Sequence, residues 1–253
     1  MIPIRSKITE AMRRPDCIMG VTGDGGGSWL SPITADGAQP TTLPAAAGQP
    51  WAIGSGILKN YGLDSLFEFH GVANASCGSA LDMQGYGGDF SFFVDCEIDT
   101  PPSSQSGAWY LPFLCQGLLT SYLGYSTGFA FRKASATANW QIYGAVSSGS
   151  GQVYSVYALT PTEAVGRHHI ALVRDATAGT LSCYWRGIKR HTATNTIVSS
   201  PLNPAIRSGY GAERGIAIGA GATTGVLYPG TYRVHAAAVF NRALSAEEIA
   251  YLS

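Results

Sequence analysis

Two acidic residues at the end of an apolar run are the first whose spacing could do chemistry. Glu97 and Asp99 form the kind of Glu-x-Asp pair from which a glycan hydrolase can be built. Such an enzyme needs two carboxylates that flank the scissile bond, about 5 Å apart when stereochemistry is retained. Thr-Pro-Pro follows at residues 100–102, and no second glutamate lies just beyond Asp99. We therefore interpret the run as a strand that ends in a proline turn, and we expect no catalytic residues and no enzyme activity.

Histidine and cysteine residues do not form a metal site in the sequence. His168 and His169 are adjacent, and adjacent strand residues point to opposite faces of a sheet, so the pair cannot hold one ion. The five cysteines lack a Cys-x-x-Cys pair, and their number is odd, unlike a secreted disulfide framework. Cys96 and Cys183 lie in apolar runs and are expected to be free, buried thiols.

The composition indicates short strands joined by turns. Charged residues make up 13% of the 253 residues, and 32 residues are glycine. The 16 basic residues balance the 16 acidic ones, which predicts neither nucleic acid nor membrane insertion. A neutral chain lacks charge repulsion between copies, so a homo-oligomer is expected.

Strand patterns recur at short intervals from residue 66 onward, and no helices alternate with them. The pattern predicts an all-β fold, a two-sheet antiparallel jelly-roll sandwich closed by a short C-terminal helix. Ser245 and Glu248 form a capping box for that helix. The expected strands are Leu66–His70, Ala80–Met83, Phe90–Ile98, Trp109–Cys115, Gly128–Lys133, Trp140–Val146, Val153–Ala158, His169–Arg174, Leu181–Arg186, Gly215–Ile218 and Tyr232–Phe240.

Three blocks of this region resemble the laminin-G-like domains of the concanavalin A-like superfamily. They are ALDMQGYGGDFSFFVDCEI at 80–98, GRHHIALVRDATAGTLSCYWRG at 166–187, and the segment 215–252 that ends in AVFNRALSAEEIAYL. Their order matches that family, in which tryptophan often precedes the histidine pair; Arg167 stands there instead. The resemblance predicts a laminin-G-like sandwich over residues 65–253.

The resemblance implies two kinds of ligand. Some laminin-G-like domains bind calcium at a loop rim, where the oxygen donors here are Asp82, Asp89, Asp95 and Asp175. Turn chemistry explains these aspartates equally well, so no cofactor is expected and calcium stays an alternative. The face away from the core can form a concave glycan-binding sheet. Strand phase places Arg132, Gln141, Tyr143, Tyr184 and Arg186 there, although these residues also fit an ordinary surface or a subunit contact.

Residues 1–64 differ from the rest of the chain. Residues 4–14 can form a short helix that Pro15 ends, and glycine- and proline-rich segments without periodicity follow. We expect an extended N-terminal arm that anchors the chain to partner subunits.

These features together suggest a virion protein. The N-terminal residues lack the apolar core of a signal peptide, and no run approaches ~18 apolar residues. A structural, decoration or tail-fibre protein of a bacteriophage is made in the host cytoplasm and released by lysis. We therefore expect localisation in the virion, the arm contacting other virion subunits, and the sandwich facing a host-surface glycan. A non-viral carbohydrate-binding or adhesion module, and a glycan hydrolase, are the alternatives.

Overall fold

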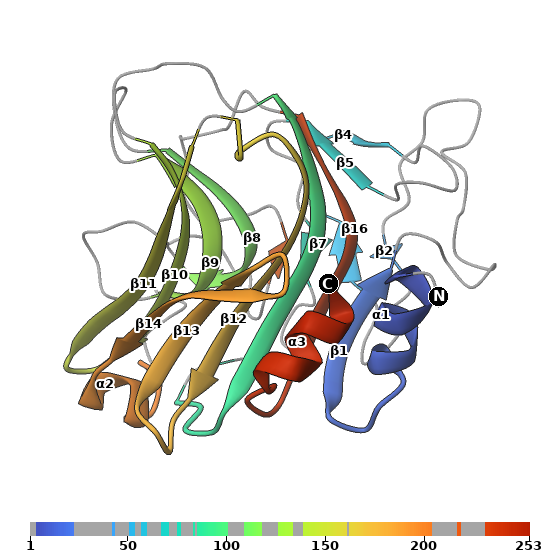
Figure 1. The fold of residues 1–253 in the computed structure, drawn as a ribbon. Coiled ribbons are helices and arrows are strands. Elements are labelled where there is room, and N and C mark those ends of the chain that lie inside the picture. The colour runs from blue at the N-terminus through green and yellow to red at the C-terminus, as the bar shows by residue number, and fades with distance from the viewer. Residues whose placement is uncertain are drawn as a thin grey trace.

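A computed structural model describes residues 4–22, 42–43, 51–53, 57–59, 67–70, 75–76, 83, 85–100, 109–117, 126–133, 139–160, 162–203, 217–218 and 231–253. Two antiparallel sheets stack face to face (Figure 1), which confirms the predicted all-β sandwich. None of the helices in these ranges has the length and apolarity needed to cross a lipid bilayer.

Sheet A is the layer whose outer face carries helices α1 (Ile4–Met12) and α3 (Ala246–Leu252). Its strands are, in spatial order, β14 (Ile188–Thr194), β13 (Thr180–Trp185), β12 (Gly166–Asp175), β7 (Phe90–Thr100), β16 (Thr231–Phe240), β5 (Phe67–His70) and β4 (Ile57–Lys59), with β1 (Cys17–Thr22) also paired to β16. The helices are α1 (Ile4–Met12), α2 (Thr196–Ser199) and α3 (Ala246–Leu252).

Sheet B forms the second layer. Its strands are, in spatial order, β11 (Gly151–Leu159), β10 (Trp140–Ser148), β9 (Ser126–Lys133), β8 (Trp109–Gly117), β15 (Ala217–Ile218), β6 (Ala75–Ser76), β3 (Trp51–Ile53) and β2 (Thr42–Leu43). Ten of the eleven expected strands are present with small shifts at their ends, and most of the eleventh, at 80–83, lies outside the described residues.

The core fills the space between the sheets. Side chains that alternate along β7, β9, β10, β12 and β13 point inward and are buried together, among them Phe92, Phe129, Ile142, Leu172 and Cys183. The thiol of Cys183 is buried and unpaired, as the sequence predicts, and so is that of Cys96. Burial raises the pKa of the Cys183 thiol to about 12, so it remains protonated and packs as a small apolar group.

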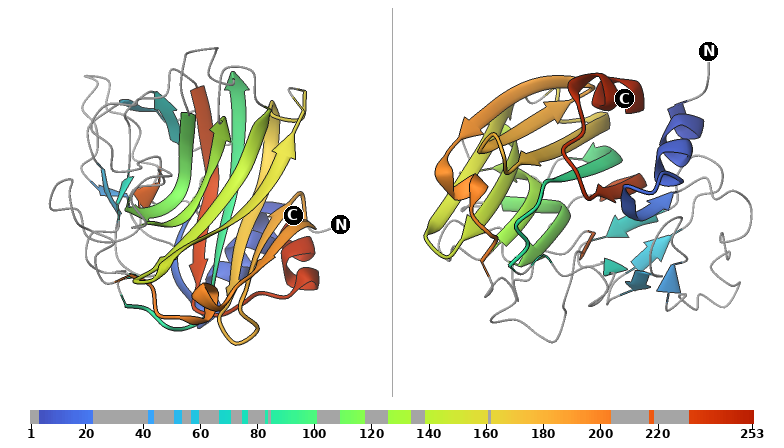
Figure 2. Two further views of the ribbon diagram at one scale, coloured as in Figure 1. Left: turned by 90° about the vertical axis from the view of Figure 1, so that its left-hand side faces the viewer. Right: turned by 90° about the horizontal axis from the view of Figure 1, so that it is seen from below.

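The outer face of sheet A carries a second apolar cluster, which strand alternation did not predict. Helices α1 and α3 cover this face on the side of the molecule away from β9–β11 (Figures 1 and 2). Tyr184 was expected to be exposed there, but it is 3% exposed, in one cluster with Ile249 and Leu252 of α3. The prediction was wrong because a helix that packs on a sheet buries the face that alternation assigns to solvent.

The described parts of residues 1–64 belong to the sandwich. Helix α1 is present as predicted, and β1 pairs with β16 over Cys17–Phe240 to Thr22–Ala236. Strands β2 and β3 join sheet B, while β4 joins sheet A. For these parts, the prediction of an extended arm was wrong. They pair with strands of the sandwich through main-chain hydrogen bonds, which require no alternation of side chains that the sequence could have revealed. A domain boundary at residue 64 and an anchoring role remain predictions.

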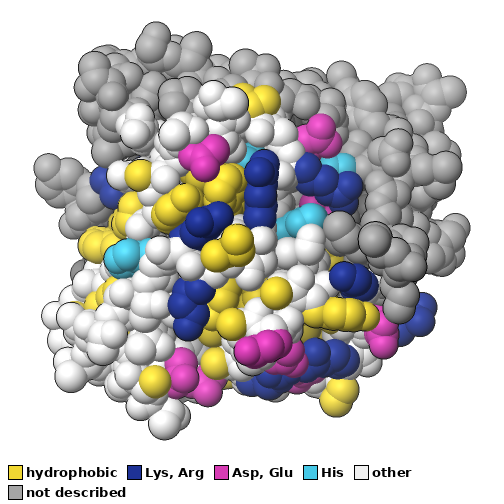
Figure 3. Space-filling view, viewed as in Figure 1, with side chains coloured by type: hydrophobic (Ala, Val, Ile, Leu, Met, Phe, Trp, Pro, Cys, Tyr) yellow, Lys and Arg dark blue, Asp and Glu magenta, His cyan; other side chains and the backbone are white. Residues whose placement is uncertain are grey.

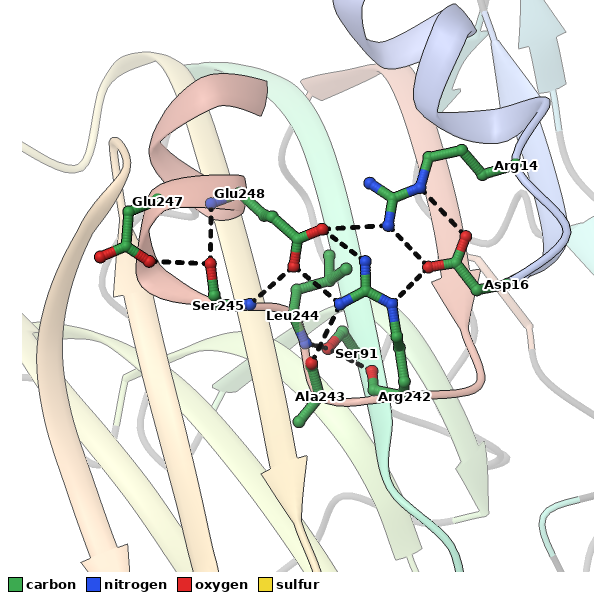
Figure 4. A network of polar contacts seen from close by, with 9 residues as sticks. All are labelled: Arg14, Asp16, Ser91, Arg242, Ala243, Leu244, Ser245, Glu247 and Glu248. Carbon is green, nitrogen blue, oxygen red and sulfur yellow. Dashed lines mark hydrogen bonds and ion pairs between the residues drawn. The ribbon is translucent and has the colours of Figure 1, made fainter.

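A polar network joins the N- and C-terminal segments (Figure 4). Asp16 accepts hydrogen bonds from Arg14 and Arg242, and the same two guanidinium groups pair with Glu248 of α3. Glu248 also completes the predicted capping box, in which Ser245 accepts from the Glu248 backbone N–H. One carboxylate therefore caps α3 and ties it to the segment before β1.

Gly144 of β10 sets the spacing between the sheets, because a side chain here would enter the packed core. A Cβ at this position would lie 2.2 Å from Cδ1 of Leu172, which is itself buried. We expect Gly144→Ala to lower the free energy of unfolding by about 2 kcal/mol through overpacking, measured by urea denaturation. Gly149→Ala is the matched control, since no atom lies within 4 Å of its Cβ position. Equal stability of the two variants would contradict this reading.

Candidate functional site

Three of the five predicted glycan-binding residues meet on the outer face of sheet B. Arg132 of β9 lies directly opposite Gln141 of β10. The Arg132 guanidinium lies 4.7 Å from the centroid of the Tyr143 ring, and the Tyr154 ring of β11 follows at 5.1 Å. We call Arg132, Gln141, Tyr143, Tyr154 and Gln152 the β9–β11 row.

The exposed groups of the β9–β11 row are planar and polar. Tyr143 is 2% exposed, so its ring supports its neighbours and does not itself meet solvent. The side chains of Arg132, Gln141 and Tyr154 are partly exposed. Tyr154 donates its hydroxyl to Gln152, whose amide donates to Ser147 Oγ at 3.2 Å. The row therefore offers a hydrogen-bonded phenol, an amide and a guanidinium on one face of sheet B.

Tyr184 and Arg186 lie on the other sheet. Tyr184 is buried under α3, with the Lys189 ammonium 5.6 Å from its ring centroid. Arg186 follows β13 in a left-handed backbone conformation, with φ 51°, and its guanidinium stacks 4.6 Å from the Trp185 ring. The structure thus divides the predicted glycan-binding set between two surfaces.

A polar cluster occupies the outer face of sheet A beyond the helices. Arg167 donates from Nε and Nη2 to the two carboxylate oxygens of Asp95, at 2.9 and 2.6 Å. His169 Nε2 lies 3.3 Å from Asp95 Oδ1. Burial alone would raise the pKa of Asp95, but the hydrogen bonds from Arg167 and the close contact with His169 outweigh it and hold the pKa at about 2. Figure 3 shows basic, acidic and histidine side chains together on this face.

Glu97 lies two residues beyond Asp95 on β7, near His235. Glu97 Oε2 is 3.3 Å from His235 Nε2, and the side chain of Asp99 lies outside the described residues. A glycosidase needs one protonated carboxyl group as its acid. Asp95 cannot supply that proton at neutral pH, because its pKa is about 2 and its oxygens face Arg167 and His169. Asp95 therefore fits a structural anion better than a general acid.

His168 and His169 point to opposite faces, as predicted. His168 is in the core, where its Nδ1 accepts a hydrogen bond from Trp185 Nε1 at 3.0 Å. Burial, followed by the nearby charge of Arg186, lowers the pKa of His168 to about 4, so the ring is neutral near pH 7. Within the described ranges, no three His, Cys, Asp or Glu side chains gather as metal ligands.

The aspartates considered for calcium hold turns or ion pairs. Asp89 Oδ1 accepts from the Ala176 backbone N–H at 2.8 Å, and Asp175 Oδ1 accepts from Ala178 at 2.8 Å. The Asp175 bond is the turn contact that a short acidic side chain makes, whereas the Asp89 bond ties the segment before β7 to the turn after β12. Asp82 lies outside the described residues.

Solved structures with the same fold include enzymes and receptor-binding domains. A Trypanosoma rangeli sialidase in complex with 2,3-difluorosialic acid aligns with 95% of this chain and 33% of its own, at 14% identity and TM-score 0.59. The binding domain of botulinum neurotoxin DC, in complex with rat synaptotagmin II, aligns with 97% of this chain and 51% of its own, at 10% identity and TM-score 0.57. A crystal structure described as a receptor binding domain aligns with 99% of this chain and 52% of its own, at 10% identity and TM-score 0.58.

These likenesses show the fold alone. No protein-family model matches the sequence, and no curated protein matches it. The chain spans a third of the sialidase chain and about half of the receptor-binding chains. The chain is an all-β sandwich of two antiparallel sheets.

Proposed function

We propose that this chain is a non-catalytic binding module that recognises a glycan through the β9–β11 row. The observation that supports this most is Gln141, whose partly exposed amide makes no hydrogen bond to the described residues and lies beside Arg132. Sugars are held by planar polar groups that order their hydroxyls and by aromatic surfaces that stack on the ring. Arg132 supplies a planar polar group opposite Gln141, and Tyr154 supplies an aromatic surface further along the row, beside Tyr143.

The proposed setting is a virus particle. A structural, decoration or tail-fibre protein with a laminin-G-like sandwich would face outward and bind the host surface, while residues 1–64 would contact sister subunits. The low charge content and the abundance of glycine support this context. Mass spectrometry of purified particles is expected to find the chain in a fixed ratio to the capsid protein. Consistent absence of the chain from the particles would favour the alternative hypothesis of a non-viral adhesion module.

The binding function has a direct test in the intact chain. On an array of neutral and charged glycans, we expect binding that Gln141→Ala weakens about tenfold, the effect of losing hydrogen bonds in a desolvated site. Asn241→Ala removes an exposed amide from the turn before α3 and should bind like the parent. Tyr184→Ala is unsuitable as a binding test, because it removes a buried ring from the cluster under α3.

Two results would contradict the proposal. Equal binding by the parent and Gln141→Ala, with both folded, would remove the β9–β11 row as the site. Glycan hydrolysis by the parent that Glu97→Gln abolishes would make the chain an enzyme.

A further inference from the structure

A basic and aromatic cluster lies at the edge where β11 meets the β13–β14 hairpin. Arg190 of β14 lies 5.3 Å from the Tyr157 ring centroid and 5.1 Å from that of Trp185. The Arg186 guanidinium lies 4.6 Å from the Trp185 ring centroid, and the centroids of the Tyr157 and Trp185 rings are 5.8 Å apart. We call Tyr157, Trp185, Arg186 and Arg190 the edge cluster. Figure 3 shows basic side chains beside hydrophobic ones on this part of the molecule.

The aromatic base of the edge cluster is rigid. Trp185 is buried, and its indole N–H donates to neutral His168, which fixes the ring plane. Trp185 pairs with Ile188 across a two-residue turn in which Arg186 and Gly187 both have positive φ, 51° and 74°. Arginine is uncommon in this conformation. The turn therefore holds the Arg186 side chain beside Trp185 in a backbone conformation that is less favourable for arginine than for glycine.

The two guanidinium groups keep hydrogen-bond donors available. Ring stacking uses the faces of a guanidinium and leaves the N–H groups in its plane. Neither Arg186 nor Arg190 forms a hydrogen bond or an ion pair with any described residue, and Nε of Arg190 is buried without an acceptor. The planar N–H donors of a guanidinium match the geometry of a group with two anionic oxygens, such as a carboxylate.

Glu163 does not neutralise the edge cluster. Its Oε2 accepts from the backbone N–H and the hydroxyl of Thr160, at 2.8 and 2.9 Å. That carboxylate is within electrostatic range of Arg186 and Arg190 but is held in its own turn. Two positive charges therefore face one negative charge that is already bonded. Ile188, 54% exposed and paired with Trp185, adds an apolar surface beside them.

We propose that the edge cluster binds an acidic saccharide, with Arg186 and Arg190 holding a carboxylate or sulfate group and the sugar ring lying against Tyr157 and Ile188. This inference rests on the proposed glycan-binding function but uses a different surface from the β9–β11 row. It also gives Arg186 a ligand-binding role apart from Tyr184, with which the sequence had grouped it.

The test measures binding of defined probes to the full chain by titration calorimetry at low salt. The probes are oligogalacturonate, which carries only carboxylates, sulfated dextran oligomers, which carry only sulfates, and uncharged dextran. At least one acidic probe is expected to bind, and Arg186→Gln and Arg190→Gln should each weaken it about tenfold, the effect of losing a charge-assisted hydrogen-bond pair. The probe that binds distinguishes a carboxylate from a sulfate ligand.

Arg13→Gln is the matched control, since it removes one exposed positive charge at the end of α1. Arg190→Lys keeps the charge but loses the planar fork, so it should bind more weakly than the parent. Thermal unfolding checks that each variant is folded. Because Arg186 is exposed, Arg186→Gln removes a charge while leaving the stacking of Arg190 on Tyr157 and Trp185 in place.

Three outcomes would overturn the proposal. They are no binding of either acidic probe, an equal loss in Arg13→Gln, and acidic-probe binding that Gln141→Ala abolishes while Arg186→Gln and Arg190→Gln leave it intact. The last result would support the β9–β11 row and reject the edge cluster. If only Arg186→Gln and Arg190→Gln lose binding of the acidic probes, the edge cluster is supported, even where Gln141→Ala binds the glycan array as well as the parent does.

Discussion

Replacing Arg174 with alanine is expected to lower the free energy of unfolding by about 4 kcal/mol, at the upper end of single-residue effects. Arg174 is 0% exposed and connects β12 to the C-terminal end of α2 and to the loop before β7. It donates to the carbonyl oxygens of Val198 and Ser200 at 2.9 and 2.6 Å, and to those of Tyr86 and Gly88 at 3.2 and 2.7 Å. Alanine would leave the carbonyls of Val198, Ser200 and Gly88 without this donor and a cavity beside them, while the Tyr86 carbonyl would keep its bond from the Leu202 backbone N–H.

Urea denaturation followed by tryptophan fluorescence measures this effect. Arg174→Lys should lose less, because an ammonium can satisfy some of the carbonyls but cannot span all four. Arg13→Ala, at an exposed position, should change stability by less than about 0.5 kcal/mol. A loss below about 1 kcal/mol in Arg174→Ala would mean that water replaces the guanidinium and that the loops do not depend on it.

Asp95→Asn is expected to remove stability at pH 7, by at most about 2 kcal/mol, and much less near pH 2. The folded pKa of Asp95, about 2, lies below its ordinary value of 3.8. A group with a depressed folded pKa stabilises the protein above its unfolded pKa, and this contribution is lost as pH falls through the folded pKa. The difference corresponds to about 2 kcal/mol as an upper value, because Arg167 is 39% exposed and solvent weakens the pair.

Urea denaturation from pH 7 to pH 2 tests the linkage. The stability difference between parent and Asp95→Asn should hold down to about pH 4 and shrink toward pH 2. Asp175→Asn is the matched control, since an asparagine oxygen can still accept from Ala178. A stability difference that does not change with pH would show that Asp95 acts through packing and not through its charge.

The sequence predicted the strands well because alternation and turn residues are local signals. Residues 181–185 alternate between the core and the outer face, as expected. The predicted capping box of Ser245 and Glu248 is present at the start of α3. Tyr154 could also have been found locally. A two-residue turn between Ser148 and Gly151 sets the hairpin register, which places Tyr154 opposite Ala145 and beside Tyr143. By contrast β14 was missed, because its residues IKRHTAT are mostly exposed and lack an apolar face.

The candidate sites depended on which strands become neighbours. Arg132 and Gln141 meet because their strands pair, and strand phase sufficed to predict a shared face. Tyr184 has the expected phase, but its strand lies in the other sheet and beneath a helix, and Arg186 lies in the exposed turn after that strand.

The sequence alone determined the strand phases, the closing helix and the absence of a second glutamate just beyond Asp99. Only the tertiary structure decided that α1 and α3 bury the outer face around Tyr184, that Arg190 meets Tyr157 from another strand, and that β1 pairs with β16. These contacts join residues far apart in the chain. Their formation depends on sheet order and helix packing, which no local pattern of side chains specifies.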